Sequence, residues 1–113
     1  MNDIKLMNKA ADNIRILAAS MVEKAKSGHP GGAMGGADFV NVLFSEFLVY
    51  EPKNPAWEGR DRYFQDPGHM SPMLYSVLAL AGKFTIDELK EFRQWGSPTP
   101  GHPARDIMPR LAD

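Results

Sequence analysis

Histidine occurs three times in this sequence, and each time it directly follows a glycine. His29 lies in the run Ser-Gly-His-Pro-Gly-Gly, His69 in Asp-Pro-Gly-His, and His102 in Thr-Pro-Gly-His-Pro. An imidazole has an unperturbed pKa of about 6.5, so it can donate or accept a proton near neutrality. Glycine permits backbone conformations that other residues resist, and proline fixes φ, so such loops hold an imidazole rigidly. The pattern favours an acid–base site built from pre-positioned histidines.

Two other interpretations of the histidines remain open at this point. A single Gly-His pair is more simply a surface turn, and this reading weakens only because all three histidines share the pattern. A three-histidine zinc site is the other possibility, although the close ligand spacing usual for zinc is missing. A zinc protein of this kind would bind the metal stoichiometrically and lose stability on chelation.

His69 has a further feature, because it is predicted to lie where a strand ends and a helix begins. The first N–H groups of a helix and the positive end of its dipole point toward such a turn. This arrangement favours an anion, commonly a phosphate. An ordinary strand-to-helix connection would give the same local sequence.

Four helices and one strand are predicted to position these loops, so the expected fold class is mainly α with one short strand. Apolar residues at helical spacing predict helices over 7–25, 39–48 and 70–81. A capping-box pattern from Thr85 to Glu88 opens a fourth helix, which is expected to bury Ile86, Leu89 and Phe92. Glycine and proline over 27–32 are expected to break any helix, and 96–113 is expected to be an extended loop. The strand is Arg62–Gln65, and a lone strand lacks a partner for its backbone groups.

Composition narrows the function by exclusion. The 113 residues suffice for one small domain, and the formal net charge of -1 offers no basic surface for nucleic acid or anionic membranes. The absence of cysteine excludes disulfides and thiolate metal sites. The N-terminus lacks the features of a signal peptide, and no apolar stretch reaches membrane-spanning length, so a cytoplasmic protein is expected.

Four segments of the sequence carry distinctive motifs in a fixed order. The run 26–31, Lys-Ser-Gly-His-Pro-Gly, resembles the signature near the N-terminus of the transketolase family. The segment 54–64 is similar to its Asn-Pro…Arg-Asp-Arg stretch, and 68–75 to its Gly-His…Leu-Tyr turn and helix. The segment 89–103 is similar to the stretch that ends in Thr-Pro-Gly-His-Pro. The ordered set covers nearly everything from the first helix to Pro103.

The resemblance implies a parent α/β protein, a three-layer thiamine-diphosphate-binding fold with a largely parallel sheet, and makes residues 1–113 the N-terminal part of its diphosphate-binding domain. It implies transfer of a two-carbon ketol unit from a ketose phosphate to an aldose phosphate, as in the pentose phosphate pathway. Thiamine diphosphate with Mg²⁺ or Ca²⁺ would be the cofactor, and it would supply the nucleophile. Sugar phosphates and a second copy in a homodimer are the implied partners.

Four residues take roles from the resemblance. His29 would contact the substrate's hydroxyl and carbonyl region and assist proton transfer. His102 would hydrogen-bond the reactive end of the donor. His69 would face the cofactor's diphosphate, and Gly68 would lie in the same binding turn. None of these residues is implied as a metal ligand.

Parts of the family's machinery do not occur in the sequence. The Gly-Asp-Gly…Asn segment that binds the metal is missing, Asp61 and Asp66 are not in that context, and the cofactor-activating glutamate is missing too. The chain alone is therefore expected to be inactive. The end, 104–113, departs from the family, which fits a truncated gene, a frameshifted end or an excised piece of a longer chain. The alternatives are one subunit of a split transketolase, joined by the missing remainder, and a non-catalytic docking protein with exposed apolar helix faces.

Overall fold

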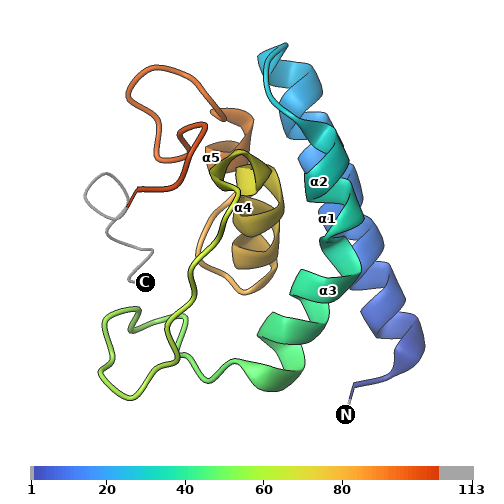
Figure 1. The fold of residues 1–113 in the computed structure, drawn as a ribbon, viewed down its shortest axis with the longest axis vertical. Helices are drawn as coiled ribbons and strands as arrows, with labels where there is room; N and C mark the ends of the chain where they lie inside the picture. The colour runs from blue at the N-terminus through green and yellow to red at the C-terminus, as the bar shows by residue number, and fades with distance from the viewer. Residues whose placement is uncertain (1, 105–113) are drawn as a thin grey trace.

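Helix α1, Ile4–Ala25, is the longest element of the computed structural model, which describes residues 2–104 (Figure 1). The helix begins where the Asp3 side chain accepts a hydrogen bond from the Lys5 N–H. It ends at Lys26, whose left-handed backbone turns its N–H to the Glu23 carbonyl oxygen. The helix predicted from apolar spacing over 7–25 is therefore confirmed, with one more turn at its start.

Three short helical segments follow: α2, Pro30–Gly35; α3, Ala37–Val42; and the π-helix η1, Leu43–Phe47. Helices α2 and α3 pack against α1, and η1 continues from α3 (Figure 1). The prediction that the glycine- and proline-rich run to residue 32 breaks any helix is wrong from Pro30 onward. Proline suits the first position of a helix, because the N–H it lacks would have no partner there. The helix predicted over 39–48 is confirmed in type, but it starts earlier and is divided into α3 and η1.

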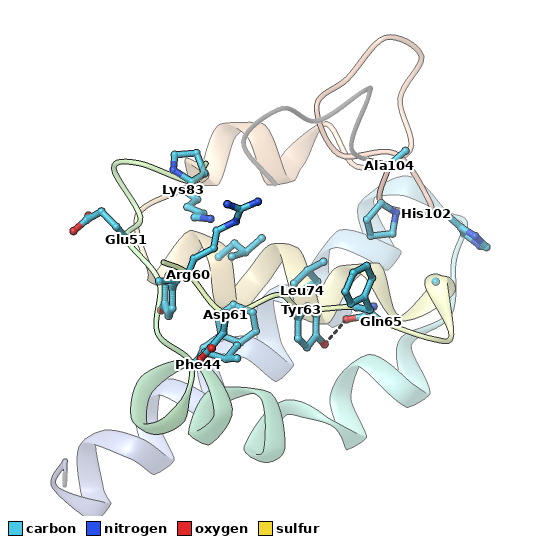
Figure 2. Close-up of a pocket in the computed structure, with 17 residues that line it drawn as sticks. Phe44, Glu51, Arg60, Asp61, Tyr63, Gln65, Leu74, Lys83, His102 and Ala104 are labelled. Carbon is cyan, nitrogen blue, oxygen red and sulfur yellow. Dashed lines mark hydrogen bonds between the residues drawn. The ribbon is translucent and has the colours of Figure 1, made fainter. Parts of the chain in front are cut away.

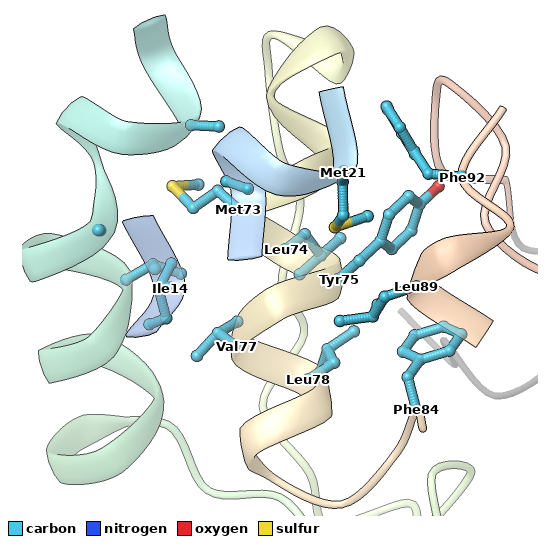
Figure 3. Close-up of a cluster of buried hydrophobic side chains, with 14 of the residues drawn as sticks. Ile14, Met21, Met73, Leu74, Tyr75, Val77, Leu78, Phe84, Leu89 and Phe92 are labelled. Carbon is cyan, nitrogen blue, oxygen red and sulfur yellow. The ribbon is translucent and has the colours of Figure 1, made fainter. Parts of the chain in front are cut away.

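Helix α4, Ser71–Leu80, follows the short 3-10 helix η2, Gly68–Met70, and forms the centre of the core. Every residue from 71 to 78 is buried, so the helix is covered all round rather than on one predicted side. Figure 3 shows α4 packed between the α1 side of the molecule and the segment around α5, Ile86–Lys90. The side chains labelled there are Ile14, Met21, Met73, Leu74, Tyr75, Val77, Leu78, Phe84, Leu89 and Phe92.

The predicted strand at Arg62–Gln65 is wrong, because residues 2–104 contain no strand. Residues 61–65 are extended without regular pairing. Their start is tied to Val49 by two bonds, one from the Asp61 N–H to the Val49 carbonyl oxygen and one from the Val49 N–H to the Asp61 carboxylate. A strand needs a neighbouring strand for its N–H and C=O groups, and the described residues provide none.

The capping box predicted for α5 is confirmed, since Thr85 and Glu88 each bond the other's backbone N–H. Leu89 and Phe92 are buried as expected, but Ile86 is 51% exposed and does not join the core. Residues 96–104 form turns and bends without a helix, in agreement with the predicted loop, and the rest of that loop, 105–113, lies outside the described residues. In the part of the chain that the structure describes, no helix is both long and apolar enough to cross a membrane.

Candidate functional site

The structure brings His29 and His69 into ring contact. His29 is the residue before α2, and His69 is the middle residue of η2. Their ring centroids lie 4.8 Å apart, with a tilt of 56° between the planes. His69 lies two residues before α4 begins at Ser71, so its predicted place at a helix start holds although the preceding strand does not.

His102 lies on the other side of the same short turn. A Cβ atom built on Gly68 would come within 3.0 Å of the His102 Nδ1 atom and 3.3 Å of its Cγ. His29 and His102 are exposed, and His69 is partly buried. Three loops that are remote in sequence thus place their imidazoles around η2, as expected for groups that act together.

Two hydroxyl groups on α4 hold the loop that carries His102. The Ser71 Oγ donates a hydrogen bond of 2.6 Å to the Gly101 carbonyl oxygen. One turn later, the Tyr75 hydroxyl donates a bond of 2.5 Å to the Pro100 carbonyl oxygen. Both side chains are fully buried, so the two bonds fix the loop against the core. Burial raises the pKa of Tyr75 above its ordinary value, which keeps this donor protonated at neutral pH.

Thr99 anchors the same loop from the side of α5. Its buried hydroxyl donates to the Glu88 carbonyl oxygen at 3.1 Å, and its own carbonyl oxygen accepts the Arg93 N–H at 3.0 Å. The sequence alone predicts no role for Ser71, Tyr75 or Arg93. The sequence indicates their role only indirectly, because all three are polar residues beside apolar ones, in or next to the segments that resemble the family.

The glycines before the histidines have two different physical roles. Gly28 has φ of +124°, a conformation that a side chain would strain. Gly68 and Gly101 do not have positive φ; they leave space, Gly68 for His102 and Gly101 for Arg93, whose Nε would lie 2.9 Å from an added Cβ. The predicted conformational freedom therefore applies to one glycine of the three.

A cavity of about 420 Å³ extends from His102 across the molecule. Figure 2 shows His102 and Ala104 at one end of it and Lys83, Arg60 and Glu51 at the other. The floor is apolar and includes Phe44, Leu74 and Leu78. Burial, reinforced by repulsion from Arg60, lowers the pKa of Lys83. His29 and His69 do not line this cavity, so the histidine cluster and the cavity meet only at Gly68 and His102.

Among residues 2–104, no three His, Asp or Glu side chains lie together as a metal site requires. The imidazoles beside the start of α4 offer donors that suit a diphosphate. The described residues therefore fit the anionic end of a diphosphate cofactor, and they provide no carboxylate set for its metal ion.

The sequence and fold match known proteins closely. Residues 6–110 match the family described as transketolase, thiamine diphosphate binding domain. The chloroplastic transketolase-1 of Arabidopsis thaliana is 50% identical over 111 residues, which cover 96% of this chain and 15% of that protein. The crystal structure of Campylobacter jejuni transketolase has a TM-score of 0.87 at 44% identity, covering 95% of this chain and 17% of the other.

A Pichia stipitis transketolase solved with sedoheptulose-7-phosphate has a TM-score of 0.87 at 42% identity, covering 91% of this chain and 15% of the other. The chain thus spans about 15% of the length of the relatives that it matches. All three Gly-His loops fall within the matched residues 6–110. Since the family match covers almost the whole sequence, the chain belongs to the transketolase family and represents part of its thiamine-diphosphate-binding domain.

Proposed function

We propose that this chain supplies the histidine-bearing edge of the cofactor and substrate site of a transketolase. The reaction is transfer of a two-carbon ketol unit from a ketose phosphate to an aldose phosphate. The observation that carries the proposal is the convergence of His29, His69 and His102 around η2. Thiamine diphosphate, when bound, supplies the nucleophilic carbon, and the protein binds, orients and moves protons.

The three histidines take different tasks in this proposal. His69 and the Gly68 turn bind the diphosphate, because they lie at the start of α4, where helix N–H groups and the dipole favour an anion. His29, in ring contact with His69, orients the substrate hydroxyl and carbonyl groups. His102 has its Nδ1 edge against Gly68, so its Nε2 is the nitrogen turned away from η2. We assign the hydrogen bond to the donor's reactive end to that Nε2 atom.

This stretch of residues is proposed to be inactive by itself. Residues 2–104 contribute no carboxylate cluster for Mg²⁺ or Ca²⁺, and the metal motif and activating glutamate of the family do not occur in the sequence. Without a metal ion, the charge of the diphosphate would be balanced only by imidazoles and a helix start. The metal ligands and the glutamate are proposed to come from other residues of a complete enzyme.

Exposed aromatic side chains support the need for a covering partner. Phe47 is 71% exposed, Phe64 is 77% exposed and Trp95 is fully exposed. Apolar groups of this size favour burial. We propose that the remainder of a transketolase chain, or a second subunit that carries it, covers them, and that the complete enzyme is a homodimer acting on sugar phosphates. A cytoplasmic location stays a prediction from the sequence.

A chimera tests this function. The segment of Campylobacter jejuni transketolase that aligns with this chain is replaced by the present sequence, and ketol transfer from sedoheptulose-7-phosphate to an aldose phosphate is measured. We expect an active chimera in which His29→Ala or His102→Ala lowers kcat by about 10²–10⁴-fold. His69→Ala should instead weaken thiamine diphosphate binding. Lys24→Ala, an exposed change on α1, is the matched control. A folded chimera that binds cofactor but ignores the histidine changes would contradict the proposal.

Calorimetric titration of the chain itself with thiamine diphosphate and magnesium separates the two kinds of partner. No measurable binding is expected if the metal ligands belong to the remainder of a longer chain. Magnesium-dependent binding would contradict the proposed inactivity of this stretch. It would favour a split enzyme, whose second subunit should then restore ketol transfer when mixed with this one.

A further inference from the structure

Arg93 lies between the loop of His29 and the loop of His102. Its Nη1 donates a hydrogen bond of 2.5 Å to the Ser27 Oγ, two residues before His29. Its Nε would lie 2.9 Å from a Cβ on Gly101 and 3.8 Å from a Cβ on Gly28. The two glycines that directly precede exposed histidines therefore both face the same guanidinium group.

The backbone of Arg93 is fixed as tightly as its side chain. It has φ of +63°, a left-handed conformation that costs free energy for any residue other than glycine. Its N–H donates to the Thr99 carbonyl oxygen at 3.0 Å, within the loop that leads to His102. Its guanidinium carbon lies 5.8 Å from the centre of the buried Phe92 ring, which supports the plane of the group.

Stability alone does not explain an arginine at this position. The Nε atom is buried and has no hydrogen-bond partner among the described residues, and an orphan donor is costly. Within residues 2–104, no carboxylate pairs with this guanidinium. A strained backbone and an unpaired donor are retained where the local structure serves a site.

We propose that Arg93 is a positioning residue that sets the separation between His29 and His102. The rigid guanidinium group lies between the two loops: its Nη1 donates to Ser27 on one side, and its Nε lies against Gly101 on the other. Gly101 is a glycine in part because a side chain there would displace the guanidinium group, whereas Gly28 is required by its φ of +124°. The inference rests on the proposed function only in taking His29 and His102 as working groups.

Amide hydrogen exchange and histidine ring signals, followed by NMR on the full chain without cofactor, test this proposal. Arg93→Gln should speed exchange in both 27–29 and 99–102 by about tenfold, since a charge-assisted contact is lost. The ring signals of His29 and His102 should shift, while the core amides of α4 keep their rates. Arg93→Lys should not rescue either loop, because an ammonium group cannot contact both sides. Arg62→Gln, at an exposed arginine on the extended segment, is the matched control.

Removing one contact at a time distinguishes an arginine that links the two loops from one that only stabilises the whole fold. Ser27→Ala should affect the His29 loop and leave 99–102 unchanged. An equal acceleration of all amides by Arg93→Gln, α4 included, would show that the arginine only stabilises the fold and would overturn the proposal. Unchanged loops would overturn it as well.

If Arg93→Gln fails to fold, Gly101→Ala decides, because the added methyl group pushes the guanidinium from the far side. The His29 ring signal must then shift although the change is in the other loop, and an unshifted signal overturns the proposal. These readouts need no ketol transfer. If the chimera is inactive but Arg93 couples the two loops, the proposed function is rejected and this inference stands. If the chimera is active but the loops respond independently, only this inference is rejected.

Discussion

The Tyr75 hydroxyl lies 2.5 Å from the Pro100 carbonyl oxygen and donates a hydrogen bond to it from a fully buried side chain. The bond connects the centre of α4 to the loop that presents His102. The ring itself packs edge-on against Phe84 and Phe92. One side chain therefore contributes both to the core and to the position of a candidate site residue.

Tyr75→Phe separates these two contributions. The ring and its packing remain, but the Pro100 carbonyl loses its donor, so the free energy of unfolding should fall by about 1–2 kcal/mol. Exchange of the amides in 99–102 should rise more than exchange in α1. Urea denaturation and hydrogen exchange measure the two effects. Ser71→Ala removes the adjacent bond to Gly101, and its effect should be coupled to that of Tyr75→Phe in a double-mutant cycle. Simple additivity would contradict a shared role in holding the loop.

Gly68→Ala should move His102 without unfolding the protein. The new methyl group would come within 3.0 Å of the His102 Nδ1 atom, and the exposed ring can yield by a few tenths of an ångström. We expect a shifted His102 ring signal in NMR, with a change in unfolding free energy below about 1 kcal/mol. Gly31→Ala is the matched control, since a Cβ there meets nothing within 4 Å. A His102 signal that stays in place would show that Gly68 does not set the ring position.

Two neighbouring glycines should respond in opposite directions to the same change. Gly35 lies in α2 with open space at its Cβ position, so Gly35→Ala should stabilise the protein by about 0.4–1 kcal/mol through the unfolded state. A Cβ on Gly36 would lie 2.6 Å from the Sδ of the buried Met73, so Gly36→Ala should destabilise it by about 1–3 kcal/mol. Thermal and urea unfolding of both variants check the pair. Equal effects would show that the turn at Gly36, directly after α2, does not lie as close to Met73 of α4 as the structure places it.

The sequence predicts correctly those helices that are determined by residues close together in the chain. The apolar spacing of α1 and the Thr85–Glu88 capping box determine those helices within a few residues of chain, and both predictions are confirmed. Because glycines surround Pro30, the sequence predicts a break in the helix there. Proline also suits the first position of a helix, and α2 begins at this residue. The strand predicted at 62–65 is wrong because its cause is not local. Aromatic residues favour a strand only where another strand pairs with them, and a short stretch of sequence does not show whether one does.

The sequence predicts which histidines form the candidate site, but it does not predict the contacts that hold their loops in place. The repeated Gly-His pattern identified the residues that the fold brings together around η2. The supports of these loops act across long stretches of chain, Arg93 on Ser27 and Tyr75 on Pro100, and such contacts leave no periodic trace in a single sequence. The roles of Gly68 and Gly101 are equally hidden in the sequence. Only the fold shows that Gly68 leaves space for His102 and that Gly101 leaves space for Arg93.

Alkaline pH should destabilise the protein through its tyrosines. Burial raises the pKa of Tyr50, Tyr63 and Tyr75, which are all the tyrosines of the chain. A group whose pKa is raised on folding contributes stability that is complete below its unfolded pKa, about 10 for tyrosine. Above that pH the unfolded state releases protons that the folded state retains, so stability falls as pH rises toward the folded pKa values.

Lys83 has the opposite sign, because its pKa is lowered on folding. Between that lowered pKa and about 10.4 the unfolded chain holds more protons, so this lysine makes stability rise with pH. We therefore expect the urea midpoint to hold or rise slightly up to about pH 10 and then to fall, with tyrosinate absorbance appearing together with unfolding. Tyr75→Phe should make the fall shallower, and Lys83→Met should remove the earlier rise. Tyrosinate absorbance that develops fully while the chain stays folded would contradict the burial of these side chains.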